Sequence, residues 1–174
     1  IGCGPGVQTI ELAKLSKGRI IALDNHQAFL DKLIKKAKEE ALLDSIVPQN
    51  RSMLDMGFAE NTFDIIWSEG ALYFMGFQNG LKKCRQLLKN DGFLGVTEMV
   101  YLVNDPPAPL TQYIEKEYPD IKRVQDKIDL IQNEGFFLIS NFTLPKSSWL
   151  DNFYLPMQEE LVRLNKKYQG NKIA

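Results

Sequence analysis

The residues best suited to ligand chemistry stand at the start of the chain, where Gly2, Gly4 and Gly6 alternate with other residues. Glycine permits backbone conformations with positive φ and lets a ligand approach the chain without a Cβ in the way. A helical pattern follows directly, and the free N–H groups at a helix N-terminus attract negative charge. By itself, this loop predicts either a nucleotide-type ligand or only a tight turn between a strand and a helix.

Asp24 is the second candidate for ligand binding. It directly follows an apolar run and lies about 20 residues after the glycine loop, the spacing that a strand–loop–helix–strand unit produces. A carboxylate at a strand end can accept hydrogen bonds from both hydroxyls of a ribose. Asp24 could instead cap the next helix, but Asn25 is equally placed for that role. Together, the glycine loop and the acidic strand end predict a nucleoside ligand. A dinucleotide is disfavoured, because its fingerprint asks for a small residue where Val7 stands.

These candidates need elements that bring strand ends together, and the apolar pattern predicts such elements. Strands are expected at 19–23, 45–50, 63–68, 93–99 and 136–144, and helices at 7–16, 25–41, 78–89, 121–133 and 159–168. This alternation predicts an α/β fold with a Rossmann-like open, mostly parallel sheet and helices on both faces. Ligands of such sheets bind at the carboxyl ends of the strands. Residues 90–92 read as a turn, and residues 103–120, with four prolines, as an irregular insertion.

Length and composition fit one domain over residues 1–174, with 44% hydrophobic residues. A net charge of -1 gives no global attraction to nucleic acid or to an anionic membrane, and neither partner is expected. Cys3 and Cys84 are the only cysteines and lack metal-ligand spacing, which favours a reducing, cytoplasmic setting and no metal site. The sequence leaves the oligomeric state open.

Several runs of the sequence resemble motifs of class I S-adenosylmethionine (SAM) dependent methyltransferases. Residues 1–6 look like the first motif of that family, and residues 58–67 resemble a stretch typical of its type 11 branch. Residues 67–71 and 88–93 match the fourth strand of that branch and the turn before its fifth. The resemblance implies a class I methyltransferase fold, SAM as the cofactor and a small molecule as the methyl acceptor.

The resemblance also implies roles for single residues at the donor site. Gly2, Cys3, Gly4 and Gly6 would line the methionine part of SAM. Asp24 would hold the ribose.

The adenine and the sulfonium would meet other residues. Asn25 would lie beside the adenine, and Ser52 and Met53 occupy the positions that contact the adenine after the third strand. Ser52 stands where the family commonly has an aspartate, and Asp55 could substitute for it. Ser68 would sit beside the sulfonium centre.

Catalytic candidates follow the strand that ends at Ser68. Glu69 is the carboxylate nearest the expected donor and could act as a general base or as a ligand for the methionine ammonium group. Tyr73 and Phe74 could wall the acceptor pocket or contact the sulfonium by cation–π attraction, or they could simply be core. The insertion at 103–120 occupies the place where this fold carries its acceptor-recognition segment.

The sequence also departs from the family pattern. The acidic residue expected before the first motif, and the central strand that it ends, lie outside the sequence, and the last strand of the family is not found before Ala174. We therefore expect a chain truncated at the N-terminus and perhaps at the C-terminus. An alternative to the enzyme is a methyltransferase-like nucleoside-binding module without catalysis.

Overall fold

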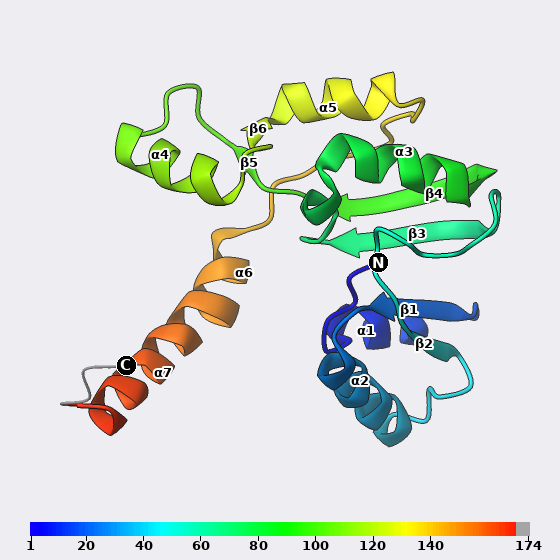
Figure 1. The fold of residues 1–174 in the computed structure, drawn as a ribbon, viewed down its shortest axis with the longest axis horizontal. Helices are drawn as coiled ribbons and strands as arrows, with labels where there is room; N and C mark the ends of the chain where they lie inside the picture. The colour runs from blue at the N-terminus through cyan, green and yellow to red at the C-terminus, as the bar shows by residue number, and fades with distance from the viewer. Residues whose placement is uncertain (170–174) are drawn as a thin grey trace. The chain divides into compact units, whose positions relative to one another are not determined.

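The computed structural model describes residues 1–169, which form helices and pairs of parallel strands (Figure 1). The chain divides into two compact units, Ile1–Leu138 and the residues from Ile139 on. The assignment of the whole chain to a single domain remains a prediction.

The first unit begins with a strand–helix–strand arrangement behind the glycine loop. Helix α1, Val7–Leu15, leads into strand β1, Ile20–Asp24. Helix α2, Gln27–Glu39, then connects β1 to the parallel strand β2, Ile46–Asn50. Parallel strands need such a crossover, because the chain must return to the same end of the sheet before it starts the second strand.

The rest of the first unit repeats this arrangement twice. Its elements are β3 (Phe63–Glu69), η1 (Leu72–Met75), α3 (Phe77–Leu87), β4 (Leu88–Thr97), β5 (Val100–Tyr101), α4 (Ala108–Glu117), β6 (Lys122–Arg123) and α5 (Val124–Asn133). β3 pairs with β4 and β5 pairs with β6, so all three strand pairs of the described residues are parallel. The predicted α/β fold class is confirmed.

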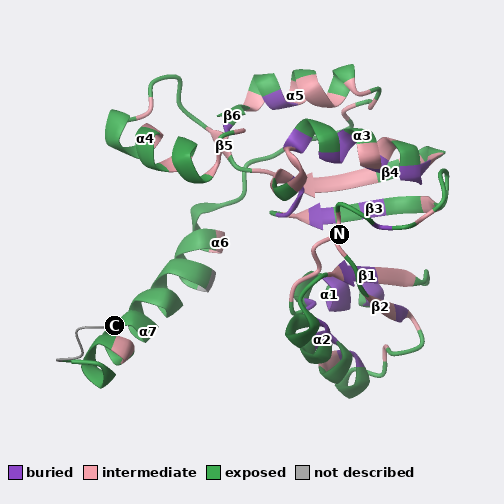
Figure 2. Ribbon diagram, viewed as in Figure 1, coloured by how far each residue is buried: buried purple, intermediate pink, exposed green. Residues whose placement is uncertain are grey.

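Strand β1 shows why helices cover both faces. Successive side chains of a strand point to opposite sides. Ala22 packs into a buried cluster with Ile10 of α1 and Leu33 of α2, whereas Leu23 joins a second cluster that includes Leu81 of α3. Figure 2 shows that buried residues of the first unit lie on strands such as β1 and β3 and on the helices next to them.

Helix α2 forms on an apolar stripe that the sequence predicts. Leu30, Leu33 and Ala37 are buried, and their spacing of three and four residues places them on one face. The prediction that Asn25 caps this helix is wrong, since the N-cap residue is His26. The Asp24 carboxylate accepts a hydrogen bond from the N–H of His26 at 2.9 Å. The last residue of β1 is therefore hydrogen-bonded to the N-cap residue of α2.

The predicted turn at residues 90–92 lies inside β4. Phe63 pairs with Leu88 and Ile65 pairs with Phe93, so the ladder contains a bulge between these two pairs. Extra residues in a bulge are accommodated by bending one strand, without ending it.

Residues 103–120 are less irregular than their four prolines suggest, because ten of them form α4. Pro107 is the N-cap residue of this helix and Pro109 lies in its first turn. Proline is tolerated there, since the first N–H groups of a helix have no partner within the helix.

The predicted strand at 136–144 is wrong, because these residues form neither strand nor helix. Phe137 and Phe142 are 96% and 81% exposed. A strand needs the edge of a neighbour for its backbone hydrogen bonds, and no strand of the described residues pairs with this segment.

The second unit is helical where it is described. It contains α6 (Lys146–Trp149), the π-helical turn η2 (Leu150–Tyr154) and α7 (Leu155–Lys167). The predicted helix at 159–168 is therefore present and starts earlier. Within residues 1–169, no helix combines the length and the apolar character needed to cross a bilayer.

The contact between the glycine loop and α2 predicts a large effect of one methyl group. Gly6 has a φ of +85°, and a Cβ at this position would overlap the side chain of Leu33. We expect Gly6→Ala to lower the free energy of unfolding by about 2 to 4 kcal/mol through backbone strain and overpacking. Urea unfolding followed by circular dichroism measures this change. Gly18→Ala is the control, because a Cβ there meets only Ser16 Oγ at 3.9 Å; equal effects of the two variants would contradict the packing role.

Candidate functional site

The glycine loop has a backbone that only glycine adopts readily. Gly2, Gly4 and Gly6 have φ values of 64°, 52° and 85°, the region in which other residues are strained. A Cβ on Gly2 would lie 2.5 Å from the Cβ of Ala71. A Cβ on Gly4 would meet no atom within 4 Å. Packing therefore explains Gly2 and Gly6, whereas Gly4 leaves open backbone that a ligand can approach.

Hydrogen bonds hold the loop between β1 and β3. The N–H of Cys3 donates to the carbonyl oxygen of Leu23 in β1 at 3.0 Å. The nitrogen of Ile1 donates to the carbonyl oxygen of Trp67 in β3 at 2.7 Å. The hydroxyl of Ser68 donates to the carbonyl oxygen of Ile1 at 3.2 Å. The carboxyl ends of two strands from different strand pairs thus meet at one loop.

Asp24 joins the same group through its carboxylate. Its Oδ2 accepts a hydrogen bond from the N–H of Gly4 at 2.8 Å, and its Oδ1 accepts the one from His26 described above. Each carboxylate oxygen has two lone pairs, so both oxygens retain the capacity to accept a hydroxyl donor. The structure thus brings Asp24, the residue predicted to bind the ribose, to Gly4, the most open glycine of the loop.

The three predicted adenine-side residues have different surroundings. Met53 approaches the loop, because its Cε lies 3.5 Å from where a Cβ on Gly2 would stand. The hydroxyl of Ser52 accepts a hydrogen bond from the N–H of Leu54 at 3.1 Å, so it stabilises its own turn. Asn25 is exposed next to Asp24.

Glu69, a predicted catalytic residue, has partners on both carboxylate oxygens. Trp67 Nε1 donates to Oε1 at 2.7 Å, and Gln8 Nε2 donates to Oε2 at 3.2 Å. No local pattern in the sequence predicts the role of Gln8 as a partner of Glu69, because the two residues lie 61 positions apart along the chain. This arrangement ties the end of β3 to the first turn of α1.

Tyr73, the other predicted catalytic residue, lies in an aromatic stack. Its ring centroid lies 4.0 Å from that of Phe74 and 4.3 Å from that of Tyr118. Burial, and then the negative charge of Glu98, raise the pKa of Tyr73 above its usual value. The hydroxyl of Tyr73 therefore keeps its proton at neutral pH.

One charged pair near this stack has no signal in the sequence. Lys127 Nζ and Glu98 Oε1 lie 3.1 Å apart, and the two side chains are only 5% and 7% exposed. The partners are 29 residues apart, on α5 and just beyond β4, so no local spacing predicts their contact.

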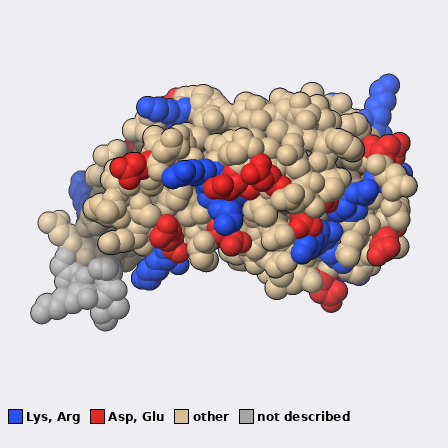
Figure 3. Space-filling model, turned by 90° about the horizontal axis from the view of Figure 1, so that it is seen from above, with Lys and Arg blue, Asp and Glu red and all other residues tan. Residues whose placement is uncertain are grey.

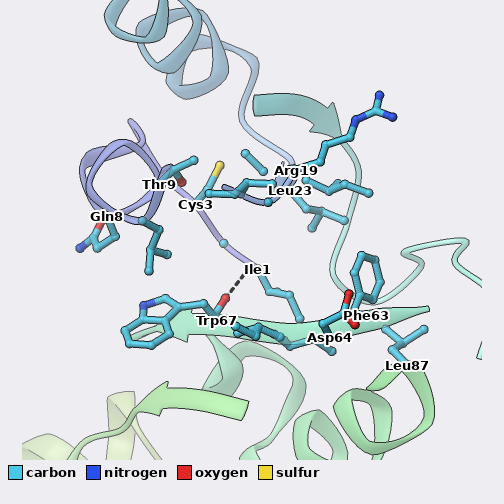
Figure 4. Close-up of a pocket in the computed structure, with 18 of the residues that line it drawn as sticks. Ile1, Cys3, Gln8, Thr9, Arg19, Leu23, Phe63, Asp64, Trp67 and Leu87 are labelled. Atoms are coloured by element: carbon cyan, nitrogen blue, oxygen red, sulfur yellow. Dashed lines mark hydrogen bonds between the residues drawn. The ribbon is translucent and has the colours of Figure 1, made fainter. Parts of the chain in front are cut away.

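A cavity of about 320 Å³ lies between β1 and β3. The residues that line it from these strands include Ile20–Leu23 and Phe63–Trp67, and Ile1 lines it as well (Figure 4). Within the described residues, β1 pairs only with β2, and β3 only with β4. Side chains of both strands line this mainly apolar space.

A family of known proteins matches the part of the chain that holds the glycine loop. The family model described as a methyltransferase domain matches residues 1–92, a stretch that includes the glycine loop, Asp24 and β3. The chain belongs to this methyltransferase family. The match confirms the family resemblance that the sequence motifs indicate.

Curated relatives of this methyltransferase domain are longer than the chain. A sterol 24-C-methyltransferase of Aspergillus fumigatus is 23% identical over 165 residues, which cover 90% of this chain and 44% of that protein. A sterol 24-C-methyltransferase of Neurospora crassa is 21% identical, with coverages of 92% and 45%. The chain thus spans less than half the length of these relatives.

Solved structures share the fold at low sequence identity. A SAM-dependent methyltransferase from Geobacter sulfurreducens in complex with S-adenosyl-L-homocysteine (SAH) superposes with a TM-score of 0.82 at 14% identity, covering 99% of this chain and 70% of that one. A putative sarcosine dimethylglycine methyltransferase from Galdieria sulphuraria gives a TM-score of 0.76 at 19% identity, with coverages of 99% and 65%.

Charged side chains of both signs are interspersed on the face shown in Figure 3. Nucleic-acid binding usually relies on basic residues clustered on one face. The expectation that the methyltransferase domain binds no nucleic acid remains a prediction.

The thiol in the glycine loop provides a probe of this environment. Burial, with the charge of Asp24 adding to it, raises the pKa of Cys3 to about 11. Since the thiolate is the reactive form, we expect iodoacetamide to modify Cys3 at about pH 8 on the order of a hundredfold more slowly than free cysteine. Peptide mapping by mass spectrometry follows the reaction. The rate should keep rising about tenfold per pH unit up to about pH 9.5; a plateau near the pKa of free cysteine would contradict the assignment.

Proposed function

We propose that the complete protein is a SAM-dependent methyltransferase that methylates a small molecule. The open backbone at Gly4 beside the Asp24 carboxylate is the single observation that carries this proposal. A nucleoside needs backbone that it can approach closely and an acceptor for its ribose hydroxyls, and these two residues fit both needs. Family membership, and the SAM and SAH bound in related structures, support SAM as that ligand.

The proposed donor site follows the order of the chain. Gly2, Cys3, Gly4 and Gly6 would hold the methionine part, and Asp24 would bind the ribose hydroxyls. Asn25, Ser52 and Met53 would border the adenine, and Ser68 would lie near the sulfonium. Met53 has the strongest structural support of the adenine-side residues, because its Cε lies 3.5 Å from where a Cβ on Gly2 would stand.

The chemistry asks mainly for positioning. When bound, SAM supplies a methyl group that an acceptor atom takes in line, as the bond from carbon to sulfur breaks and SAH is left. The chain aligns the two reactants and excludes water, which by itself accelerates such a reaction strongly. A base is needed only when the acceptor atom loses a proton.

Glu69 and Tyr73 receive supporting roles in this proposal. Both Glu69 oxygens are engaged by Trp67 and Gln8, which favours a residue that fixes the loop and the strand end over one that moves a proton. Tyr73 keeps its proton and offers an aromatic face, which suits a wall of the acceptor site.

The acceptor class rests on the names of related proteins. These include sterol and geranyl diphosphate methyltransferases and a putative sarcosine dimethylglycine methyltransferase. Their acceptors are small molecules of very different chemistry, so we propose the small-molecule class and no single acceptor from this comparison.

Replacement of Asp24 tests the donor site. Asp24→Asn keeps the shape of the side chain and removes its charge and one acceptor oxygen. Since a hydrogen bond to a charged group contributes about 1.5 to 3 kcal/mol, we expect SAH to bind about 10 to 100 times more weakly. Isothermal titration of SAH measures this change. Asp129→Asn, at an exposed position on α5, is the matched control and should bind SAH as the unaltered protein does.

The enzyme and the module without catalysis give different results in two assays. Absence of SAM and SAH binding to the complete protein would overturn both hypotheses. Binding without transfer of labelled methyl to any member of a metabolite panel would favour the module. Transfer to one acceptor, lost together with SAH affinity in Asp24→Asn, is the result that we expect.

A further inference from the structure

The buried pair of Glu98 and Lys127 lies at the ligand edge of the fold. Glu98 directly follows Thr97, the last residue of β4. The N–H of Gly70, just beyond β3, donates to Thr97 Oγ1 at 2.9 Å, so β3 and β4 end side by side. Ligands of α/β sheets bind outside the carboxyl ends of the strands. Glu98 therefore stands at the same edge as Ser68, which we place near the methyl donor.

The ion pair satisfies only half of the Glu98 carboxylate. Oε1 accepts a hydrogen bond from Lys127 Nζ at 3.1 Å. Oε2 is buried and has no hydrogen-bond partner among residues 1–169. Removing a carboxylate from water costs several kcal/mol, and burial is stabilising only when further hydrogen bonds complete the pair. Buried polar atoms without partners are rare, and at a ligand edge a donor group of a bound molecule would supply the missing partner.

Lys127 is held by more than the ion pair. Its Nζ lies 4.4 Å from the centre of the Phe77 ring, a distance at which cation–π attraction contributes. The N–H of Phe77 in turn donates to Asp120 Oδ2 at 3.2 Å. Lys127 is thus held by Phe77 and by Glu98 Oε1, and Glu98 Oε2 remains without a hydrogen-bond partner among residues 1–169.

Two tyrosines of the same cluster supply an apolar surface. The ring centroids of Tyr73 and Tyr118 lie 4.3 Å apart with a tilt of 36°, and both residues are half-buried. The charge of Glu98 contributes to the raised pKa values of both side chains, which locates the carboxylate near them. Tyr73 belongs to η1, a short helix between Gly70 and Gly76, whose φ values are 57° and 74°.

We propose that Glu98 selects the methyl acceptor by accepting a hydrogen bond from its hydroxyl or ammonium group, while Tyr73 and Tyr118 pack against its carbon skeleton. This inference rests on the proposed function, because it concerns the acceptor side of the same site. A carboxylate oxygen has only lone pairs to offer. Acceptors whose polar end carries only oxygen acceptors, such as a carboxylate, are therefore expected to bind more weakly.

Simple probes with one apolar chain and different ends test this selection. Octanol, octylamine and octanoate are titrated into the complete protein at saturating SAH, and binding is followed by saturation-transfer NMR. We expect octanol or octylamine to bind at least about tenfold more tightly than octanoate, since one hydrogen bond to a charged group is worth that much. Equal binding of all three probes, or no binding of octanol and octylamine, overturns the proposal.

Variants of Glu98 separate charge from hydrogen bonding. Glu98→Gln keeps an acceptor oxygen, so octanol should bind within about threefold of its original affinity and octylamine at least about tenfold more weakly. Glu98→Ala should bind octanol and octylamine no more tightly than octanoate. Glu117→Gln, at an exposed position on α4, is the control and should change neither. If Glu98→Ala does not fold, the proposal is tested by Glu98→Gln alone, in which octylamine should lose affinity and octanol should keep it.

The SAH titration keeps this inference distinct from the proposed function. Normal SAH binding in all variants with no change in probe preference refutes the role of Glu98 and leaves the methyltransferase function intact. Failure of the unaltered protein to bind SAH refutes the function itself.

Discussion

The site depends on the hydrogen bonds that hold the first residues of the chain between two strands. Cys3 is bonded to β1 and Ile1 to β3, and β1 and β3 belong to different strand pairs. This connection is possible because the loop turns through positive φ at three glycines, which other residues adopt only with strain. The Asp24 carboxylate and Ser68 at the end of β3 are both hydrogen-bonded to this loop.

The buried side chains of β1 set the layers of the fold. Since β1 sends alternate side chains to two buried clusters, it must be covered by helices on both faces. Parallel pairing places the ends of β3 and β4 side by side, and the glycine loop joins the end of β1 to the end of β3. Asp24 and Ser68, two residues of the proposed donor site, are hydrogen-bonded to the loop, and Glu98 follows the last residue of β4, the next strand. Proximity of the two groups is what methyl transfer requires.

Local patterns in the sequence predict the elements near the loop well. Glycine spacing, the apolar run before Asp24 and the stripe of Leu30, Leu33 and Ala37 each act within one turn or one strand, so they can be read without the fold. The predicted strand at 136–144 is wrong because strand formation needs a partner edge that a local pattern does not contain. Bonds such as those from Gln8 to Glu69 and from Lys127 to Glu98 join distant residues, and only the folded chain shows them.

The position of a bound ligand tests the central claim most directly. A crystal structure of the complete protein with SAH should show the ribose hydroxyls within hydrogen-bond distance of the Asp24 carboxylate and the amino-acid part against the backbone at Gly4. SAH bound elsewhere, with Asp24 still contacting only the backbone of Gly4 and His26, would contradict a donor site built on the glycine loop.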